Sequence, residues 1–264
     1  MSLFKPVPPK KVFESKKVVT YYTSLKHLQE PEATILNKLK DALENMRMLD
    51  IGVGCGRTTY YFSTLVKEYI GIDLSGNMIK ICKENYPERE NRAFRICDVR
   101  SMEMFEDNYF DFVLFSFNGI DNLSHNDRLM SFCEIKRVCK KGGFFCFSTH
   151  NLQSIDKLLK IDFSKNPILM TRRIVISFLR RILNGNFEKL KNKNFAMIEN
   201  GLYQHGFPFK FKRYYIKPKE QILQLNYTGF KNIEVYLLED GKKVEDQSQL
   251  NTIKDSWLYY LCNA

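Results

Sequence analysis

The chain has 264 residues, of which 44% are hydrophobic and 27% charged, a composition that excludes disordered, collagen-like and disulfide-scaffold proteins. No apolar run approaches the ~20 residues that a membrane-spanning helix requires, and the first residues lack the apolar stretch of a secretory signal. The seven cysteines form no CxxC pair, so we expect reduced thiols, no zinc site and a cytoplasmic location.

The net charge of +11 is concentrated in one block of the chain. Residues 151–219 contain fifteen Lys and Arg residues but only four acidic ones, and the rest of the chain is electrically balanced. Such a distribution indicates an added basic surface on an ordinary scaffold.

An arm and a helix precede the first strand signal. The prolines and lysines of residues 1–17 predict an extended, solvated arm. Pro31, which stands between two glutamates, predicts the start of a helix. The apolar residues of that helix recur as on one buried face: Ile35, Leu36, Leu39 and Leu43.

From residue 46 onward, short apolar runs alternate with helical patterns. We predict strands over 46–51, 69–74, 93–97, 110–117 and 144–149, and helices over 57–67, 77–85 and 127–140. After the basic block come a helix over 219–226, a strand over 230–238 and a β-prone run over 257–262. This alternation is typical of an α/β protein whose parallel sheet has helices on both faces.

The loop after the first predicted strand carries glycines at alternate positions. Gly52, Gly54 and Gly56 permit a tight turn and a close backbone approach to a ligand at the carboxyl end of the strand. The loop lacks the Gly-Lys-Ser/Thr ending of a Walker A loop, and Arg57 stands where a dinucleotide fingerprint has its third glycine. Asp50 completes the pattern acid-x-Gly-x-Gly-x-Gly.

That pattern resembles motif I of the class I S-adenosylmethionine-dependent methyltransferases of the small-molecule, methyltransferase-domain type. S-adenosylmethionine carries a sulfonium and an ammonium group but no phosphate, so the carboxylate of Asp50 is attractive beside it. Asp73 ends the second predicted strand, where a carboxylate can accept both ribose hydroxyls. Asp98 ends the third strand and resembles the family acid that receives the adenine amino group, beside the backbone NH of Val99.

Later segments resemble the same family in the same order, over about 46–150 and 218–264, although Lys141 stands where proline is usual before the fifth strand. The resemblance implies a Rossmann-like, seven-stranded sheet whose last strand is antiparallel. Met78 would pack against the adenine or belong to the core. The implied cofactor-binding residues are Asp50, Gly52, Gly54, Gly56, Asp73, Leu74, Met78, Asp98, Val99 and Ser116.

The resemblance places catalytic groups in the loops after strands four and five. His150 and His125 are the candidate general bases, because only histidine titrates near neutral pH unperturbed; a structural hydrogen bond is the alternative for both. Asn118 would orient the acceptor or cap its turn. These loops contain no Asn/Asp-Pro-Pro-Tyr/Phe, no Pro-Cys and no acidic metal set, which disfavours amino-adenine, cytosine and metal-dependent methylation. Tyr21 and Tyr22 are candidates for a lid over the cofactor or for simple aromatic packing.

The basic block lies between strands five and six, where the family builds its substrate cap. One face of a predicted helix ending at Gly185 carries Ile174, Val175, Phe178, Leu179 and Ile182, with arginines opposite. We expect this apolar face to pack on the sheet and the basic face to be solvated. A pocket for an anionic metabolite, RNA binding and contact with a membrane surface are the other interpretations.

We therefore predict an arm and helical lid over 1–45, a cofactor-binding core over 46–150, an inserted basic cap over 151–217 and the rest of the core over 218–264. The predicted activity is methyl transfer from S-adenosylmethionine to an oxygen or nitrogen of a small, anionic or glycan-type metabolite, without a metal. An RNA methyltransferase and a catalytically inactive cofactor-binding protein are the alternatives.

Overall fold

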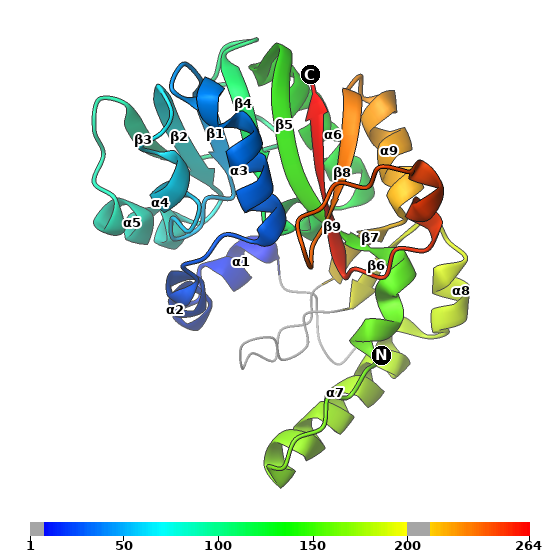
Figure 1. Cartoon of the computed structure of the whole chain (residues 1–264). Coiled ribbons are helices and arrows are strands. Elements are labelled where there is room, and N and C mark those ends of the chain that lie inside the picture. The colour runs from blue at the N-terminus through cyan, green and yellow to red at the C-terminus, as the bar shows by residue number, and fades with distance from the viewer. Residues whose placement is uncertain (1–7, 200–211) are drawn as a thin grey trace.

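A single twisted sheet organises the computed structural model, which describes residues 8–199 and 212–264 (Figure 1). Residues 1–7 of the predicted arm and 200–211 of the predicted cap lie outside the described residues. The strands are β1 Arg47–Ile51, β2 Glu68–Asp73, β3 Arg92–Ile96, β4 Phe110–Phe115, β5 Cys139–Asn151, β6 Phe195–Glu199, β7 Lys212–Ile216, β8 Lys231–Leu237 and β9 Trp257–Asn263.

Seven of these strands form the predicted Rossmann-like sheet. β3, β2, β1, β4 and β5 lie side by side in that order and run parallel. β9 follows, antiparallel to both β5 and β8. The predicted α/β class with an antiparallel last strand is therefore confirmed, and the structure adds that this strand lies beside the fifth.

The cap contributes two strands that the sequence analysis did not predict. β7 pairs in parallel with the last two residues of β5, where Tyr215 stands opposite His150, and β6 pairs antiparallel with β7. His150 pairs with Trp257 of β9 along the opposite edge of β5. β7 therefore lies along the same edge of β5 as β4, beyond the point where β4 ends. The cap thus stands at the carboxyl edge of the sheet, where α/β folds bind ligands.

Helices cover both faces of the sheet and bury two separate cores. α3 (Glu30–Leu43), α4 (Thr59–Phe62) and α5 (Gly76–Asn85) pack on one face, and α6 (His125–Val138) and α9 (Pro218–Tyr227) on the other. Within β4 the side chains alternate: Phe112 and Leu114 belong to the first core, Val113 and Phe115 to the second. Because both faces of β4 are buried, its sequence is apolar except for Asp111, which is why the sequence pattern predicted this strand.

Two predicted helices have different bounds in the structure: one is shorter, and the other is shifted by two residues toward the N-terminus. The helix expected over 57–67 is only the four-residue α4, between turns. The helix expected over 127–140 ends at Val138, because Cys139 already pairs with Phe110 as the first residue of β5.

The predicted extended arm is wrong for the residues that the structure describes. α1 (Pro9–Phe13) and α2 (Lys16–Ser24) are helical. Val12, Val18 and Val19 are buried against Cys55 and Met78, so apolar contacts with the core outweigh the proline and lysine content of this segment.

The remaining elements belong to loops and to the cap. They are η1 Gly119–Asn122, η2 Leu152–Leu158, α7 Pro167–Asn184, α8 Phe187–Lys191 and η4 Gln247–Asn251. Gly185 ends α7 with φ of 70°, as predicted. The expectation that α7 packs its apolar face on the sheet is wrong, because Phe178 and Ile182 are 62% and 61% exposed. Across 8–199 and 212–264, no helix has the length and apolar character needed to cross a membrane.

Candidate functional site

The glycine loop adopts a conformation that requires its three glycines. Gly52, Gly54 and Gly56 have φ angles of +67°, +55° and +90°, in the region that other residues rarely adopt. A Cβ atom on Gly56 would lie 2.5 Å from the ring of Tyr86. The space above Gly54 is open instead, since its nearest neighbour would be 3.9 Å away. The loop therefore leaves room for a ligand on one side and packs tightly on the other.

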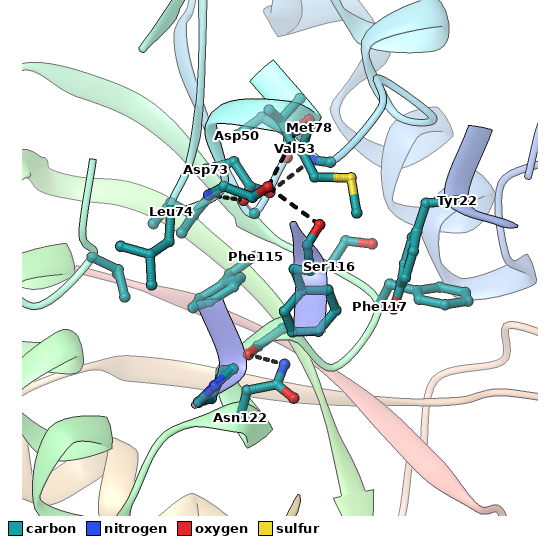
Figure 2. A pocket seen from close by; sticks show the side chains of 18 of the residues that line it. Tyr22, Asp50, Val53, Asp73, Leu74, Met78, Phe115, Ser116, Phe117 and Asn122 are labelled. Atoms are coloured by element: carbon teal, nitrogen blue, oxygen red, sulfur yellow. Dashed lines mark hydrogen bonds between the residues drawn. The ribbon is translucent and has the colours of Figure 1, made fainter. Parts of the chain in front are cut away.

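A cavity of about 170 Å³ opens beside this loop, at the carboxyl ends of the central strands (Figure 2). In Figure 2 Asp73 and Leu74 lie on one side of it, and Tyr22 and Phe117 lie together on the other. Gly56 shapes the loop without lining the cavity. The predicted residues that line it are Asp50, Gly52, Gly54, Asp73, Leu74, Met78, Asp98, Val99, Ser116, Asn118 and Tyr22.

Asp73 stands at the end of β2 with both carboxylate oxygens held by the backbone. The N–H of Gly54 donates to one oxygen at 3.0 Å and the N–H of Ser75 to the other at 2.8 Å. Burial raises the pKa of Asp73 to about 6, against the lowering effect of these hydrogen bonds. The carboxylate is therefore fixed in direction and still has lone pairs available on the cavity side.

Asp50 stabilises the glycine loop through buried hydrogen bonds. Its Oδ2 accepts hydrogen bonds from the hydroxyls of Thr58 and Tyr69, both at 2.5 Å, and the residue is almost completely buried. Burial raises its pKa to about 6, since desolvation outweighs those two hydrogen bonds. Asp50 lines the cavity as predicted, but it also ties β1 to the loop and to β2, a role that the sequence analysis did not predict.

Asp98 has a partner that the sequence analysis missed. Its carboxylate accepts hydrogen bonds from the guanidinium of Arg100, with 2.7 Å between Nη2 and Oδ2, and Arg100 also reaches Asp127 at 2.9 Å. The hydrogen bonds from Arg100 hold the pKa of Asp98 below its usual value. An adenine amino group would share this carboxylate with Arg100, so the predicted role of Asp98 stays a prediction.

The N-terminal helices close over the cavity. Pro9 and Phe13 of α1 and Tyr22 of α2 line it, and the ring of Tyr22 meets that of Phe117 edge to face, with centroids 6.2 Å apart. The hydroxyl of Ser75 donates to the carbonyl of Phe13, which ties the arm to the start of α5. This arrangement agrees with a lid over a ligand, and Tyr21 lines the neighbouring cavity described below.

A buried ion pair joins α3 to the glycine loop. Arg57 Nη2 lies 2.7 Å from Glu32 Oε1, and the same guanidinium donates to the hydroxyl of Ser116. That hydroxyl in turn donates to Glu32, and Tyr259 also contacts this carboxylate. Ser116, predicted to touch the cofactor, lines the cavity with its hydroxyl already engaged. The sequence gives no local sign of this network, because its members are far apart along the chain.

A second cavity, of about 290 Å³, adjoins the first and shares part of its wall. The residues common to both are Tyr22, Phe117, Asn118 and Arg213. Lys157 and Arg180, both from the cap, line the second cavity, and among the described residues no Asp or Glu does. The Arg180 Nε is buried and finds no hydrogen-bond partner in the described part of the chain. The described lining of this cavity is therefore basic, with Lys157 also 3.7 Å from Glu239, and it offers a buried donor at Arg180.

His150 lines the second cavity and forms a buried pair with Asp121. Its Nδ1 lies 2.6 Å from Asp121 Oδ2, and Asp121 also accepts from Thr149 and from Arg128, at 2.6 and 2.7 Å. Because a carboxylate can only accept, the proton of the neutral ring is on Nδ1 and the lone pair on Nε2. Burial lowers the pKa of His150 although Asp121 opposes this, which favours the neutral ring.

The other two catalytic candidates are placed differently. His125, the first residue of α6, lines neither cavity: its ring stacks on Phe195 at 4.1 Å, and its Nδ1 lies 2.8 Å from the hydroxyl of Tyr214. A catalytic role for His125 is therefore disfavoured, because cap strands that were not predicted cover it. Asn118 lies between the cavities with φ of +57°, and its buried Oδ1 has no partner among the described residues. It remains available to a bound ligand.

The first cavity fits the cofactor that the resemblance implies. The open space above Gly54 admits a nucleoside close to the backbone, and the fixed carboxylate of Asp73 offers acceptors for ribose hydroxyls. Asp50 and Asp98 add negative charge to the lining, which suits a cationic, phosphate-free ligand better than a pyrophosphate.

Comparisons of the sequence agree with this geometry. Residues 49–147 match the family described as "Methyltransferase domain". The chain is similar to the putative methyltransferase 235L of Invertebrate iridescent virus 6, with 28% identity over 74% of this chain and 72% of the viral protein. It is also similar to the demethylmenaquinone methyltransferase of Staphylococcus aureus, with 37% identity over 40% of this chain, and spans 44% of that enzyme.

Solved structures of methyltransferases share this fold. An S-adenosylmethionine-dependent methyltransferase from Clostridium acetobutylicum superposes with a TM-score of 0.62 over 92% of this chain and 94% of its own, at 14% identity. Phosphoethanolamine N-methyltransferase 2 of Haemonchus contortus, solved with S-adenosyl-L-methionine, gives 0.59 over 96% of this chain and 59% of its own, at 18% identity. Residues 49–147 therefore form a methyltransferase domain, and the described fold is that of class I S-adenosylmethionine-dependent methyltransferases, whose cofactor is S-adenosylmethionine.

Proposed function

We propose that this enzyme methylates an oxygen or nitrogen of a small acceptor that carries an anionic group. The observation that carries the proposal is the second cavity, which adjoins the cofactor cavity and has cap cations and His150 in its wall. The acceptor would occupy this cavity with its nucleophile directed toward the shared wall.

The charge of the cavity supports an anionic acceptor. Arg180, Arg213 and Lys157 come from three different elements of the cap and converge on one cavity. The buried Nε of Arg180 would be satisfied by a carboxylate or phosphate oxygen, since charge-assisted hydrogen bonds are the strong ones. Of the two acceptor classes expected from the sequence, anionic and glycan-type, this lining favours the first.

The His150–Asp121 pair supports acid–base assistance. The carboxylate of Asp121 holds the Nδ1–H, so Nε2 is the basic atom, and it is the atom available to an acceptor hydroxyl or ammonium proton. As the proton moves to Nε2, the ring becomes cationic and Asp121 stabilises that charge. Arg128, which pairs with Asp121, keeps the carboxylate in place.

Residues of the first cavity would hold the cofactor. We assign the ribose to Asp73, the adenine region to Asp98, Val99 and Met78, and the loop contacts to Gly52 and Gly54. When bound, S-adenosylmethionine supplies a methyl group on a sulfonium, which is already activated for displacement. Tyr22 and Phe117 would exclude water from the junction of the two cavities, and Asn118 would orient the acceptor.

The domain organisation and the location of the protein are proposed as well. We propose that residues 151–217 act as the substrate cap on the core formed by 46–150 and 218–264, with 1–45 as the lid. We also propose a cytoplasmic location, in support of which all seven cysteines are free thiols.

The test is to measure S-adenosylhomocysteine formation with matched acceptor pairs. Each pair is an alcohol, phenol or amine that carries a carboxylate or phosphate in one member and a neutral amide or hydroxyl in the other. We expect anionic members to be preferred by about tenfold or more in kcat/KM, and Arg180→Gln to reduce the preference mainly through KM. Equal or better turnover of the neutral members would overturn the anionic assignment.

The same assay distinguishes a small-molecule methyltransferase from an RNA methyltransferase. Total RNA at low ionic strength replaces the small acceptor, and methyl incorporation into RNA that weakens steeply with salt would favour an RNA methyltransferase. We expect no incorporation, because the acceptor cavity is a small hollow between cap and sheet.

A further inference from the structure

The longest helix of the cap, α7, has its polarity reversed relative to an ordinary surface helix. A helix of a globular protein turns its apolar stripe to the core and its polar stripe to water. In α7 the polar side chains Ser177, Arg180 and Asn184 face the protein and the apolar ones face outward. The helix extends away from the sheet at the lower edge of the molecule (Figure 1).

Hydrogen bonds fix the inward face. Ser177 Oγ donates to the carbonyl of Leu159 at 3.0 Å, and Arg180 Nη1 donates to that of Leu158 at 2.8 Å. Asn184 bonds both backbone groups of Glu199, donating to its carbonyl at 3.1 Å and accepting from its N–H at 2.7 Å. Rotating α7 to bury its apolar face would break all four bonds, so the outward direction of that face is determined by the fold.

The outward face is broad and apolar. Its residues follow the i, i+1, i+4, i+8 spacing of one helix face, and Ile168 lies on the same face two turns before Val175. Their side chains are exposed to between 47% and 78%: Ile168, Ile174, Val175, Phe178 and Ile182. Phe163, in the segment just before the helix, is 80% exposed. Exposed apolar surface of this extent marks an interaction site.

Positive charge surrounds this face. Lys165 precedes the helix, Arg172 and Arg181 lie along its two borders, and the sequence of α7 contains no Asp or Glu. An apolar face bordered by Lys and Arg is the composition of helices that lie in the interface of an anionic bilayer.

We propose that α7 docks this methyltransferase on anionic phospholipid bilayers. Phe178, Ile182 and their apolar neighbours enter the boundary between headgroups and acyl chains, while Lys165 and Arg181 meet lipid phosphates. The helix lies in the plane of the surface and does not cross the bilayer.

Self-association through the same face is disfavoured by charge. Two copies that packed their α7 faces together would bring several arginines into one contact with no acid from either helix to pair with them. An anionic surface instead complements Lys165, Arg172 and Arg181, which outnumber the one nearby acid, Asp162.

The experiment is co-sedimentation of the full chain with vesicles, without cofactor or acceptor, so that its outcome is independent of the proposed acceptor. One vesicle set is pure phosphatidylcholine and the other contains phosphatidylglycerol at about one third. We expect binding to the second set only, weakened by salt. Ile182→Glu should weaken it about tenfold or more, and so should the double variant Lys165→Gln, Arg181→Gln.

Matched controls come from elsewhere on the surface. Leu223→Glu changes a residue of α9 that is 58% exposed, against 61% for Ile182. Lys67→Gln with Lys80→Gln removes the same net charge from the exposed surface of the core. Both controls should bind as the wild type does, and thermal unfolding verifies that each variant is folded.

Three outcomes would overturn the proposal. The first is that the protein binds neither vesicle set. The second is that Ile182→Glu leaves vesicle binding unchanged. The third is that the protein does not bind vesicles but sediments as a dimer, which Phe178→Glu dissociates. The last outcome would assign the face to a second copy of the chain.

Discussion

Nδ1 of His150 lies 2.6 Å from Oδ2 of Asp121, and neither side chain is more than 6% exposed. The contact fixes the ring so that Nε2 is its basic atom, in a residue that lines the proposed acceptor cavity. Asp121 lies in η1 after β4 and His150 lies near the end of β5, so the fold brings the loop after β4 into contact with the end of β5.

Replacing His150 with Gln should lower kcat by about 10²–10⁴-fold, the range of a lost general base. The affinity for S-adenosylmethionine, measured by calorimetry, should stay the same, because His150 does not line the cofactor cavity. His125→Gln is the matched control and should leave kcat within about threefold of the wild type. A His125 variant as impaired as the His150 variant would invalidate the assignment.

The pH dependence of kcat/KM should report the same residue. Burial lowers the pKa of His150 from 6.5, and the base must be neutral. Activity should therefore be retained as the pH falls to 6.5 and be lost only below that value. In the His150→Gln variant, kcat/KM should no longer fall as the pH decreases in this range. If it fell as in the wild type, the titration of another group would be responsible.

Cofactor affinity should depend on ionised Asp73. Its pKa is raised to about 6, so the carboxylate is charged above this pH and protonated below it. We expect the Kd for S-adenosylmethionine to rise as the pH falls below about 6. Asp73→Asn should weaken binding about tenfold or more at pH 7.5, the value of one or two charge-assisted hydrogen bonds. Equal affinity of variant and wild type at that pH would refute the ribose assignment.

Alanine substitutions at Gly56 and Gly142 distinguish the destabilisation caused by backbone conformation from that caused by a packing clash. Both have positive φ, +90° and +78°, but a Cβ would meet Tyr86 at 2.5 Å on Gly56 and nothing within 4 Å on Gly142. Gly142→Ala should cost about 1–2 kcal/mol in unfolding free energy. Gly56→Ala should cost more and also reduce cofactor affinity, as measured by urea unfolding and calorimetry. Similar losses in both would mean that the loop adapts to the added methyl group.

The Arg57–Glu32 pair should be important for stability because it is buried. Arg57→Met leaves the Glu32 carboxylate without its main partner and should cost about 3–5 kcal/mol at pH 7. Lys83→Met, in the exposed pair with Glu88, should cost less than about 1 kcal/mol.

The pH dependence of stability checks this interpretation of Glu32. The contacts of Glu32 with Arg57 and Ser116 lower its pKa despite the opposing effect of burial, so the stability it provides is full above its unfolded pKa near 4.5 and is lost as the pH falls further. The difference between wild type and Arg57→Met should shrink over that range. If this difference in stability stayed constant as the pH fell, the ion pair between Glu32 and Arg57 would not be the cause of the difference.

The sheet from β1 to β5 was predictable because each strand is an apolar run that ends in a recognisable polar or glycine residue. The loop from Gly52 to Gly56 and the strand-end Asp73 were found for the same reason. These signals are local, and the parallel fold repeats them at the same edge of the sheet.

What the sequence did not reveal depends on contacts between distant segments. Glu32 and Arg57 meet across 25 positions and Asp121 and His150 across 29, and neither pair forms a motif. The reversed helix α7 has an ordinary amphipathic pattern, which says that one face is apolar but not which way it points. β6 and β7 were not predicted because each has only five residues and lies inside the basic block, which the sequence analysis interpreted as a helical cap.

The most direct test is a crystal structure of the enzyme with S-adenosylhomocysteine. We expect the nucleoside beside Gly54, with its ribose hydroxyls within hydrogen-bonding distance of the Asp73 carboxylate and its homocysteine sulfur facing the wall shared with the His150 cavity. A product bound elsewhere, or an Asp73 side chain turned away from the ribose, would contradict it.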